Sequence, residues 1–261
     1  MLTSERQNVY KTMDRNEFRK YFKTPGPAIL PVIHALDIDQ VTRNISIATQ
    51  AGAYGVFLIN HDFEPDRLLP IIRTTRQRFP WLWLGINFLA VTGRDAFPIL
   101  GDLQNEGVQI DAYWADDARI DERTSEQAEA CEIDEVRKQS HWNGLYFGGT
   151  AFKKQREIDP VSFHQSASLA CKHMDVVTTS GVATGKAADI EKIATFRSAC
   201  GDHPLAVASG ITPDNISDYA PLLDAILIAT GINEDGDFYN INPQRLQTVL
   251  ERSRHLTTDT R

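Results

Sequence analysis

The chain has 261 residues, which suits either one (β/α)8 barrel or two smaller domains. Its formal net charge of -8, without a dense basic block, argues against a nucleic-acid partner, because binding to a phosphate backbone needs clustered Lys and Arg. No apolar run approaches the length of a membrane span, and the first thirty residues carry charges where a signal peptide would have an apolar core. We therefore expect no membrane insertion.

The three cysteines, Cys131, Cys171 and Cys200, are widely spaced and form no Cys-x-x-Cys motif. Such spacing indicates neither a disulfide framework nor a zinc site, and it is typical of a reducing compartment. We expect a cytoplasmic protein that binds a small molecule. A homo-oligomer is compatible with the sequence.

Residues 1–24 are polar and carry a weak helical stripe of apolar side chains at Val9, Met13, Phe18, Tyr21 and Phe22. This stripe predicts a short N-terminal helical extension that packs over one end of the domain. We expect residues 25–261 to form a single domain. Short apolar runs in it are typical of strands buried on both faces, and they begin at residues 28, 55, 81, 110, 143, 175, 204 and 224.

Amphipathic helical patterns lie between these runs, so the chain repeats a strand–helix unit of roughly thirty residues. An open doubly wound sheet would also alternate strands and helices, but no Gly-x-Gly-x-x-Gly follows the first strand run. Because there are eight units, the pattern favours a single (β/α)8 TIM barrel.

The last three strand runs end in a hydroxyl residue followed by glycine, at Ser180-Gly181, Ser209-Gly210 and Thr230-Gly231. Glycine lets the backbone approach a ligand closely, and barrels of this type often hold phosphate after strands seven and eight. We therefore predict a phosphate site formed by Ser209, Gly210, Thr230 and Gly231. Thr212 is expected to cap a helix with Pro213 at its first position, which would add helical amides to the site.

Other polar residues at predicted strand ends would face the same mouth of the barrel. We predict catalytic roles for His34, Asp116 and Lys153, and substrate-binding roles for Asn60, Asn87, Thr179 and Thr184. A lysine in this position can neutralise a phosphate or act as a base, and a carboxylate can activate water. Each residue also has a structural alternative. Asn60 and Asn87 can satisfy loop backbone groups, and His34 can be a hydrogen-bonded core residue.

An acidic stretch begins at Asp116 and continues with Asp117, Asp121 and Glu122. Clustered oxygen ligands suit a divalent cation, but a run of acids after a strand is more often a solvated start of a helix. No His-x-His or His-Glu-x-x-His motif is present in the sequence. We expect no metal and no cofactor, with FMN as the alternative because its phosphate would fit the same strand ends.

Several passages resemble the BtpA family, also called the BtpA/SgcQ family, of (β/α)8 proteins. The resemblance is densest in the last third, at Val177–Lys186, Ala208–Ile216, Ala229–Gly231, Glu234–Asp237 and Asn242-Pro243. Upstream, His34, Asn60, Asn87 and Lys153 resemble the family's strand ends. Three segments depart from the family pattern, and one of them, Asp116–Arg123, matches the family's fourth loop poorly. The proline- and glycine-bearing loop after His34 is absent, and no acidic residue directly precedes Asn60.

The residues and the resemblance leave three functions open. The first is an enzyme that acts on a phosphorylated sugar or ribosyl compound, either nucleosidase-like or a lyase, with a Schiff base on Lys153 as a variant. The second is a non-catalytic assembly factor of the photosystem I biogenesis type, a role that the resemblance implies. The third is a flavin enzyme.

Overall fold

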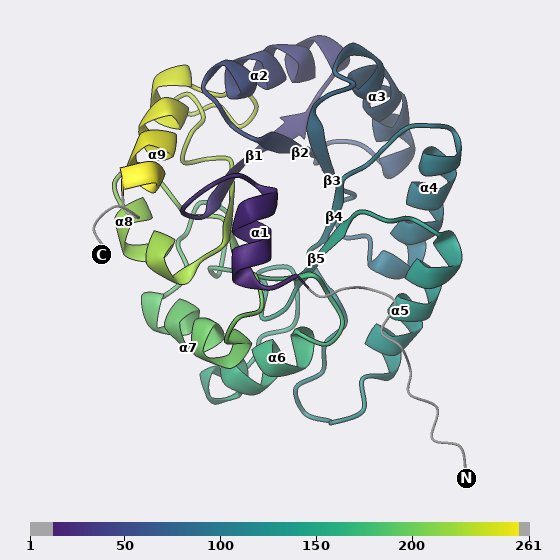
Figure 1. The fold of residues 1–261 in the computed structure, drawn as a ribbon, viewed down its shortest axis with the longest axis vertical. Helices are drawn as coiled ribbons and strands as arrows, with labels where there is room; N and C mark the ends of the chain where they lie inside the picture. Colours follow the sequence, from purple (N-terminus) through teal and green to yellow (C-terminus); the bar gives the residue numbers. More distant parts are fainter. Residues whose placement is uncertain (1–12, 256–261) are drawn as a thin grey trace.

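A computed structural model describes residues 13–255 and contains one closed barrel of eight parallel strands in chain order (Figure 1). The strands are β1 Ala28–Ala35, β2 Gly55–Asn60, β3 Trp83–Asn87, β4 Ala112–Ala115, β5 Leu145–Gly149, β6 Val176–Ser180, β7 Leu205–Ala208 and β8 Ala225–Ile228. β1 closes the barrel by pairing with β8, in a register that places Ala28 beside Ala225. The predicted fold class is confirmed, and every strand begins within two residues of its predicted start.

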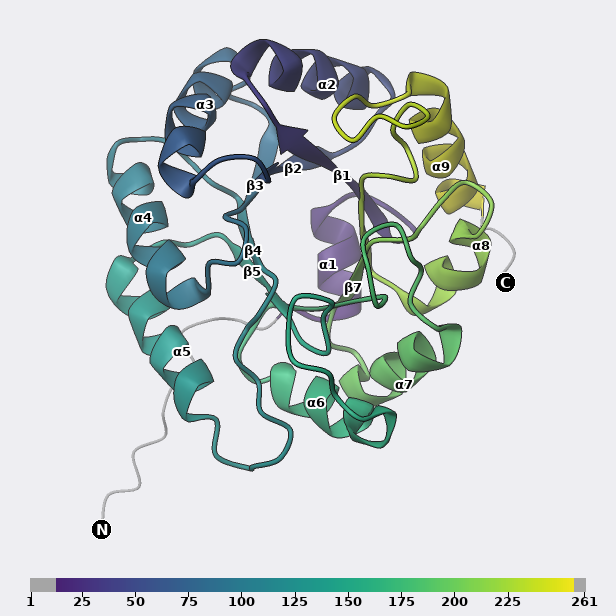
Figure 2. The same ribbon diagram turned by 180° about the vertical axis from the view of Figure 1, so that it is seen from behind.

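The helices form an outer ring around the barrel (Figures 1 and 2). They are α2 Ile38–Gln50, α3 Pro65–Arg78, α4 Gly93–Asn105, α5 Ala128–Ser140, α6 Phe163–Ala170, α7 Ile190–Cys200, α8 Ile216–Tyr219 and α9 Pro243–His255, with short 3-10 helices η1 Pro160–Ser162 and η2 Ala220–Leu222. Within residues 13–255, none of these helices has the length and apolar character to cross a membrane.

Two apolar cores hold the domain together because each strand buries both of its faces. The larger core lies between the strands and the outer helices and includes Ile33, Leu58 and Ile193. The smaller core fills the barrel interior with Leu30, Phe57, Trp114 and Phe147, among others. Along each strand, alternate residues point into the barrel, so the last inward-pointing residue of a strand is presented at its carboxyl end.

The helix α1, Arg15–Tyr21, covers the amino-terminal end of the barrel, as the stripe around Phe18 predicts (Figure 1). Asp14 caps it, and Glu17 completes the capping box. Phe18 and Phe22 are buried in the interior core, where the ring of Phe22 lies 5.2 Å from that of Trp83. The helix thus closes the end opposite the strand carboxyl ends. Val9 of the predicted stripe lies outside the described residues.

Three buried or half-buried carboxylates at strand starts each join a helix to the sheet. Each accepts a hydrogen bond from an arginine of the outer ring and one from a backbone amide of the preceding strand. The three sets are Asp111 with Arg76 and Leu84 N, Asp175 with Arg137 and Tyr146 N, and Asp224 with Arg197 and Leu205 N. The pattern recurs at β4, β6 and β8, so the same device fastens alternate helices to the barrel.

The predicted helix start at Thr212-Pro213 is wrong. The helix α8 begins at Ile216 and has only four residues, and the side chain of Asn215 at the capping position makes no capping bond to the helix. The Thr212 hydroxyl instead accepts from Asp214 N, while Asn215 Oδ1 accepts from Thr212 N and Nδ2 donates to Gly210 O. These local side-chain bonds hold the segment as a turn, which competes with a helical start.

Candidate active site

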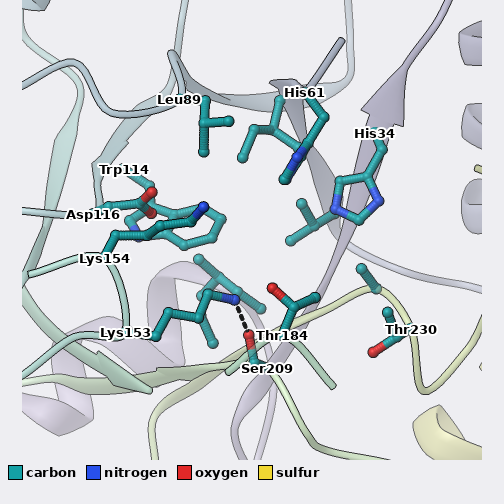
Figure 3. A pocket seen from close by; sticks show the side chains of 15 residues that line it. His34, His61, Leu89, Trp114, Asp116, Lys153, Lys154, Thr184, Ser209 and Thr230 are labelled. Carbon is teal, nitrogen blue, oxygen red and sulfur yellow. Dashed lines mark hydrogen bonds between the residues drawn. The ribbon is translucent and has the colours of Figure 1, made fainter. Parts of the chain in front are cut away.

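A cavity opens at the carboxyl ends of the strands. This end of the barrel is opposite the helix α1, which lies behind the barrel in Figure 2. The space between the walls of the cavity, including open solvent at its mouth, is about 480 Å³. Its polar lining comes from seven loops or strand ends and consists of His34, His61, Asp116, Lys153, Lys154, Thr184, Ser209 and Thr230 (Figure 3). All three predicted catalytic residues therefore meet in one place.

His34, near the end of β1, is fixed by the loop between β8 and α9. Its Nδ1 donates to the carbonyl of Phe238 at 2.7 Å, since a carbonyl oxygen can only accept, and its ring stacks on that of Phe238 at 3.8 Å. Burial lowers the pKa of His34 to about 4, against the hydrogen bond to Phe238. At neutral pH the ring is thus uncharged, with Nε2 available as an acceptor.

Asp116 follows β4 and lies across the cavity from His34 (Figure 3). Its side chain is buried and accepts a hydrogen bond of 3.2 Å from Asn87 Nδ2. Burial raises the pKa of Asp116, whereas the Asn87 bond and the charges of Lys153 and Lys154 lower it. A carboxylate with one partner and a raised pKa, facing a cavity, is suited to exchange protons with a ligand.

Lys153 lies just beyond β5, with its backbone N donating to Ser180 Oγ at 2.9 Å. Its ammonium donates to Ser209 Oγ across the ends of β6 and β7 (Figure 3). Burial lowers the pKa of Lys153, and the charge of Asp116 opposes that shift. The side chain is half-buried and directed into the cavity.

Two backbone positions next to these groups have left-handed conformations that non-glycine residues seldom adopt. These are Ala151, with φ of 47°, and Ser209, with φ of 82°. The carbonyl of Ala151 is held by Thr179 Oγ1 at 3.2 Å and by Lys192 Nζ at 2.6 Å. Thr179 is buried and does not line the cavity, so it acts on the site by holding the turn that presents Lys153.

The predicted phosphate residues divide into two kinds. Ser209 and Thr230 line the cavity, and Thr184 reaches it from the loop after β6. Gly210 and Gly231 do not line it. A Cβ on Gly210 would lie 2.1 Å from Ala187 N, and one on Gly231 would lie 1.9 Å from Ile211 O. Both glycines therefore permit close packing of loops behind the cavity wall, and their part in phosphate binding stays a prediction.

Asn60 and Asn87 are buried and lie outside the cavity lining. Asn60 Nδ2 donates to Phe63 O at 2.6 Å, and its Oδ1 accepts from Leu89 N at 3.0 Å, which joins two neighbouring loops. Asn87 acts through its bond to Asp116. The structure thus favours the alternative for Asn60, a residue that satisfies loop backbone groups, and makes Asn87 a partner of Asp116.

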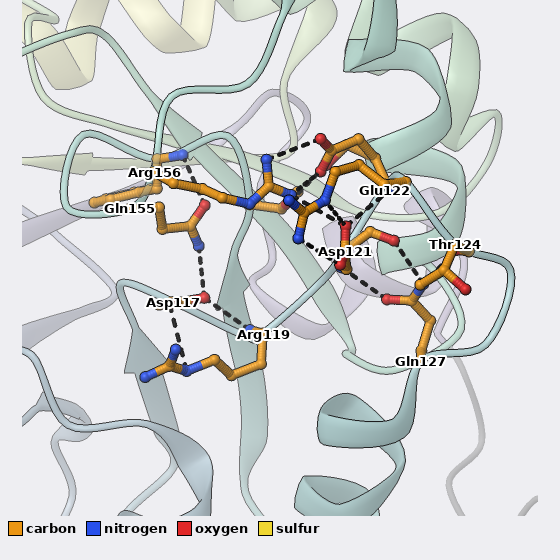
Figure 4. A network of polar contacts seen from close by, with 12 residues as sticks. Asp117, Arg119, Asp121, Glu122, Thr124, Gln127, Gln155 and Arg156 are labelled. Atoms are coloured by element: carbon orange, nitrogen blue, oxygen red, sulfur yellow. Dashed lines mark hydrogen bonds and ion pairs between the residues drawn. The ribbon is translucent and has the colours of Figure 1, made fainter.

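Three residues of the acidic stretch after β4, Asp117, Asp121 and Glu122, form ion pairs and hydrogen bonds with neighbouring side chains (Figure 4). Arg156 pairs with Glu122 and with Asp121, and Arg123 binds both oxygens of Asp121 at 2.8 Å. Asp117 accepts from Arg119 N and from Gln155. Within the described part of the chain, no group of three His, Cys, Asp or Glu side chains is arranged to hold a metal ion. Independence from metals stays a prediction.

Four further residues shape the cavity without having been among the predicted site residues. His61, Trp114 and Lys154 line it, and Phe238 covers His34. His61 and Lys154 directly follow the predicted site residues Asn60 and Lys153 in the sequence. This adjacency could have predicted that they line the cavity. Phe238 had no such signal, since it lies 204 residues from His34 along the chain.

We expect His34 to remain uncharged well below the usual histidine range, because burial lowers its pKa to about 4. Nitrogen-15 NMR at pH 6 should show that the His34 ring has a protonated Nδ1 and an unprotonated Nε2. The ring of the exposed His141 serves as the reference in the same spectrum. Since the unfolded chain binds this proton near pH 6.5 and the folded chain near 4, His34 should make stability fall as the pH is lowered through that window. A titration midpoint of His34 near 6.5 would contradict this assignment.

The BtpA family model matches residues 151–255, which confirms the resemblance over the carboxyl-terminal part of the chain. No protein of curated function gives a significant sequence match. The native KDPGal structure is similar in fold, with 8% identity, a TM-score of 0.61, and coverage of 88% of this chain and 96% of that one.

The tryptophan synthase alpha subunit of Legionella pneumophila strain Paris has 15% identity and a TM-score of 0.61, covering 95% of this chain and 99% of that chain. Phosphoribosyl anthranilate isomerase from Thermus thermophilus has 12% identity and a TM-score of 0.56, with coverage of 86% and 96%. At these identities the likeness concerns the TIM-barrel fold alone.

Proposed function

We propose that this TIM barrel, whose residues 151–255 match the BtpA family model, is an enzyme that acts on a phosphorylated sugar or ribosyl compound. One observation carries the proposal. The cavity is lined by two lysines and one aspartate, a net charge of +1 if all three are ionised, in a chain of net charge -8. A local excess of positive charge in an acidic protein favours an anionic ligand.

The anionic end of the substrate is assigned to the wall formed by Lys153, Ser209, Thr184 and Thr230. This wall offers an ammonium and three hydroxyl groups, and charge-assisted hydrogen bonds are about 1.5–3 kcal/mol each. Binding energy from the phosphate can then orient the reacting end against Asp116. Lys153 belongs to this wall and faces the cavity, so it can serve both the anion and the reacting atoms.

For a ribosyl substrate, Asp116 takes a proton from water as the water oxygen bonds to the anomeric carbon. The bond from that carbon to the leaving group breaks, and the ammonium of Lys153 donates a proton to the departing atom. His34 is unsuited to that donation, since its Nδ1 proton is engaged with Phe238 and its Nε2 carries none at neutral pH. His34 instead accepts a hydrogen bond from a substrate hydroxyl.

A panel of phosphorylated ribosides and sugar phosphates tests the proposal, with release of free base or sugar followed for each compound. We expect turnover of a phosphorylated compound and much weaker turnover of the same compound without phosphate. Dephosphorylated partners of each compound are the matched controls. Absence of turnover across the panel, together with a retained ligand that leaves the protein chemically unchanged, would favour the assembly factor. A yellow colour of the purified protein would favour the flavin enzyme.

A further inference from the structure

Two thiols meet at the end of the barrel opposite the candidate site. The helices α6 and α7 are neighbours in the outer ring (Figure 2). Because all strands are parallel, each connecting helix returns antiparallel to them. Cys171 directly follows α6, and Cys200 is the last residue of α7, so both lie at the same end of adjacent helices. The two side chains interact with each other, and the Cys171 thiol donates to the carbonyl of Ala167 at 3.2 Å. Cys171 is half-buried and Cys200 is buried.

Arg197, one helical turn before Cys200, supplies positive charge to the pair. Its Nη1 donates to Asp224, and its Nη2 donates to the carbonyls of Gly201 and His203. Its Nε is buried and has no hydrogen-bond partner in the described part of the chain. A guanidinium near a thiol favours the thiolate form.

The two thiols differ in acidity. The adjoining Cys200 side chain and the charge of Arg197 lower the pKa of Cys171, against the effect of burial. The adjoining Cys171 side chain and burial raise the pKa of Cys200. Cys171 is also the more exposed of the two, so it is the side chain that an oxidant reaches first.

We propose that Cys171 and Cys200 form a peroxide-oxidisable dithiol, in which Cys171 is oxidised first and Cys200 then closes a reversible disulfide between α6 and α7. This modification site is independent of the proposed function, because it lies at the far end of the barrel from the cavity.

The reaction balances with hydrogen peroxide as the two-electron oxidant. The Cys171 thiolate attacks one peroxide oxygen, the O–O bond breaks, hydroxide leaves, and Cys171 becomes a sulfenic acid. The Cys200 sulfur then attacks the Cys171 sulfur, the S–O bond breaks, and the departing hydroxide takes the Cys200 proton as water. In sum, two thiols and one peroxide give one disulfide and two waters.

Mass spectrometry tests the proposal. The full-length protein is treated with hydrogen peroxide, denatured and alkylated, and its thiols and disulfides are then mapped. We expect an intramolecular Cys171–Cys200 disulfide that dithiothreitol reverses, while Cys131 remains alkylated. Cys131 is an exposed thiol on α5 and serves as the internal reference. In Cys200→Ser, dimedone should trap a sulfenic acid on Cys171, and in Cys171→Ser, Cys200 should stay reduced.

Disulfides that involve Cys131, disulfides only between molecules, or oxidation of Cys131 before Cys171 would each overturn the proposal. The proposal would also be overturned if the wild-type protein did not lose two thiols at a peroxide concentration that oxidises Cys131. The wild-type mapping decides the question even if a variant fails to fold. Thermal unfolding of the untreated variants shows whether they are folded.

Discussion

Replacing Asp116 with Asn is expected to lower turnover of the substrate found in the panel about 100-fold or more, a barrier increase near 2.7 kcal/mol. The amide keeps the shape of the carboxylate and can still accept the bond from Asn87, but it cannot take a proton from water. Affinity for the substrate should change little. Steady-state kinetics of the variant and the wild type measure the effect.

The stability of the same variant should be retained or increased. Burial raises the pKa of Asp116, so the ionised carboxylate costs free energy in the folded protein at neutral pH, and Asn removes that cost. Asp117→Asn is the matched control, because Asp117 is the next residue but binds Arg119 and Gln155 outside the cavity. Equal loss of turnover in both variants, or a lowered melting temperature that explains the loss, would refute the catalytic role.

Lys153→Met should also lower turnover about 100-fold, since it removes the proposed proton donor. Lys172→Met, which changes an exposed lysine of the outer ring, is the control. If the protein is a binder instead, the same substitution weakens affinity and no catalytic deficit exists to measure. Borohydride reduction in the presence of a sugar phosphate distinguishes the Schiff-base variant, because it would add the mass of the sugar to Lys153.

The second large effect concerns stability. Asp175→Ala is expected to lower the free energy of unfolding by about 3–5 kcal/mol, because it leaves the buried charge of Arg137 without its carboxylate. Asp175 Oδ2 lies 2.5 Å from Arg137 Nη2, and the side chains of Asp175 and Arg137 are only 8% and 5% exposed. Asp175 also accepts from Tyr146 N at 2.6 Å, and the substitution leaves this amide without its side-chain partner. Urea unfolding of the variant measures the loss.

Glu132→Ala provides the comparison for that stability measurement. Glu132 pairs with Arg94 at 2.6 Å, a similar distance, but the side chains are 57% and 40% exposed. Water screens such a pair, so we expect a loss of about 1 kcal/mol or less. A comparable loss in both variants would mean that burial of the Asp175 pair does not determine its contribution.

The sequence alone determined the architecture and the location of the candidate site. Short apolar runs separated by helices can bury both of their faces as strands of a parallel sheet covered by helices, and their number of eight favoured the closed barrel over an open sheet. Because every strand of such a barrel ends on the same side, the residues His34, Asp116 and Lys153 could be placed in one mouth without knowledge of any contact between them.

The tertiary structure decided what each strand-end residue does, because that depends on contacts between distant segments. Asn60 and Thr179 occupy predicted positions, yet their side chains are committed to loop carbonyls and amides. The available nitrogen of His34 is set by the carbonyl of Phe238, which no local pattern connects to it. Likewise, the predicted start of α8 was wrong because side-chain hydrogen bonds of Thr212 and Asn215 favour a turn over a helical start. The helix-capping preferences of single residues do not show which of the two conformations is more stable.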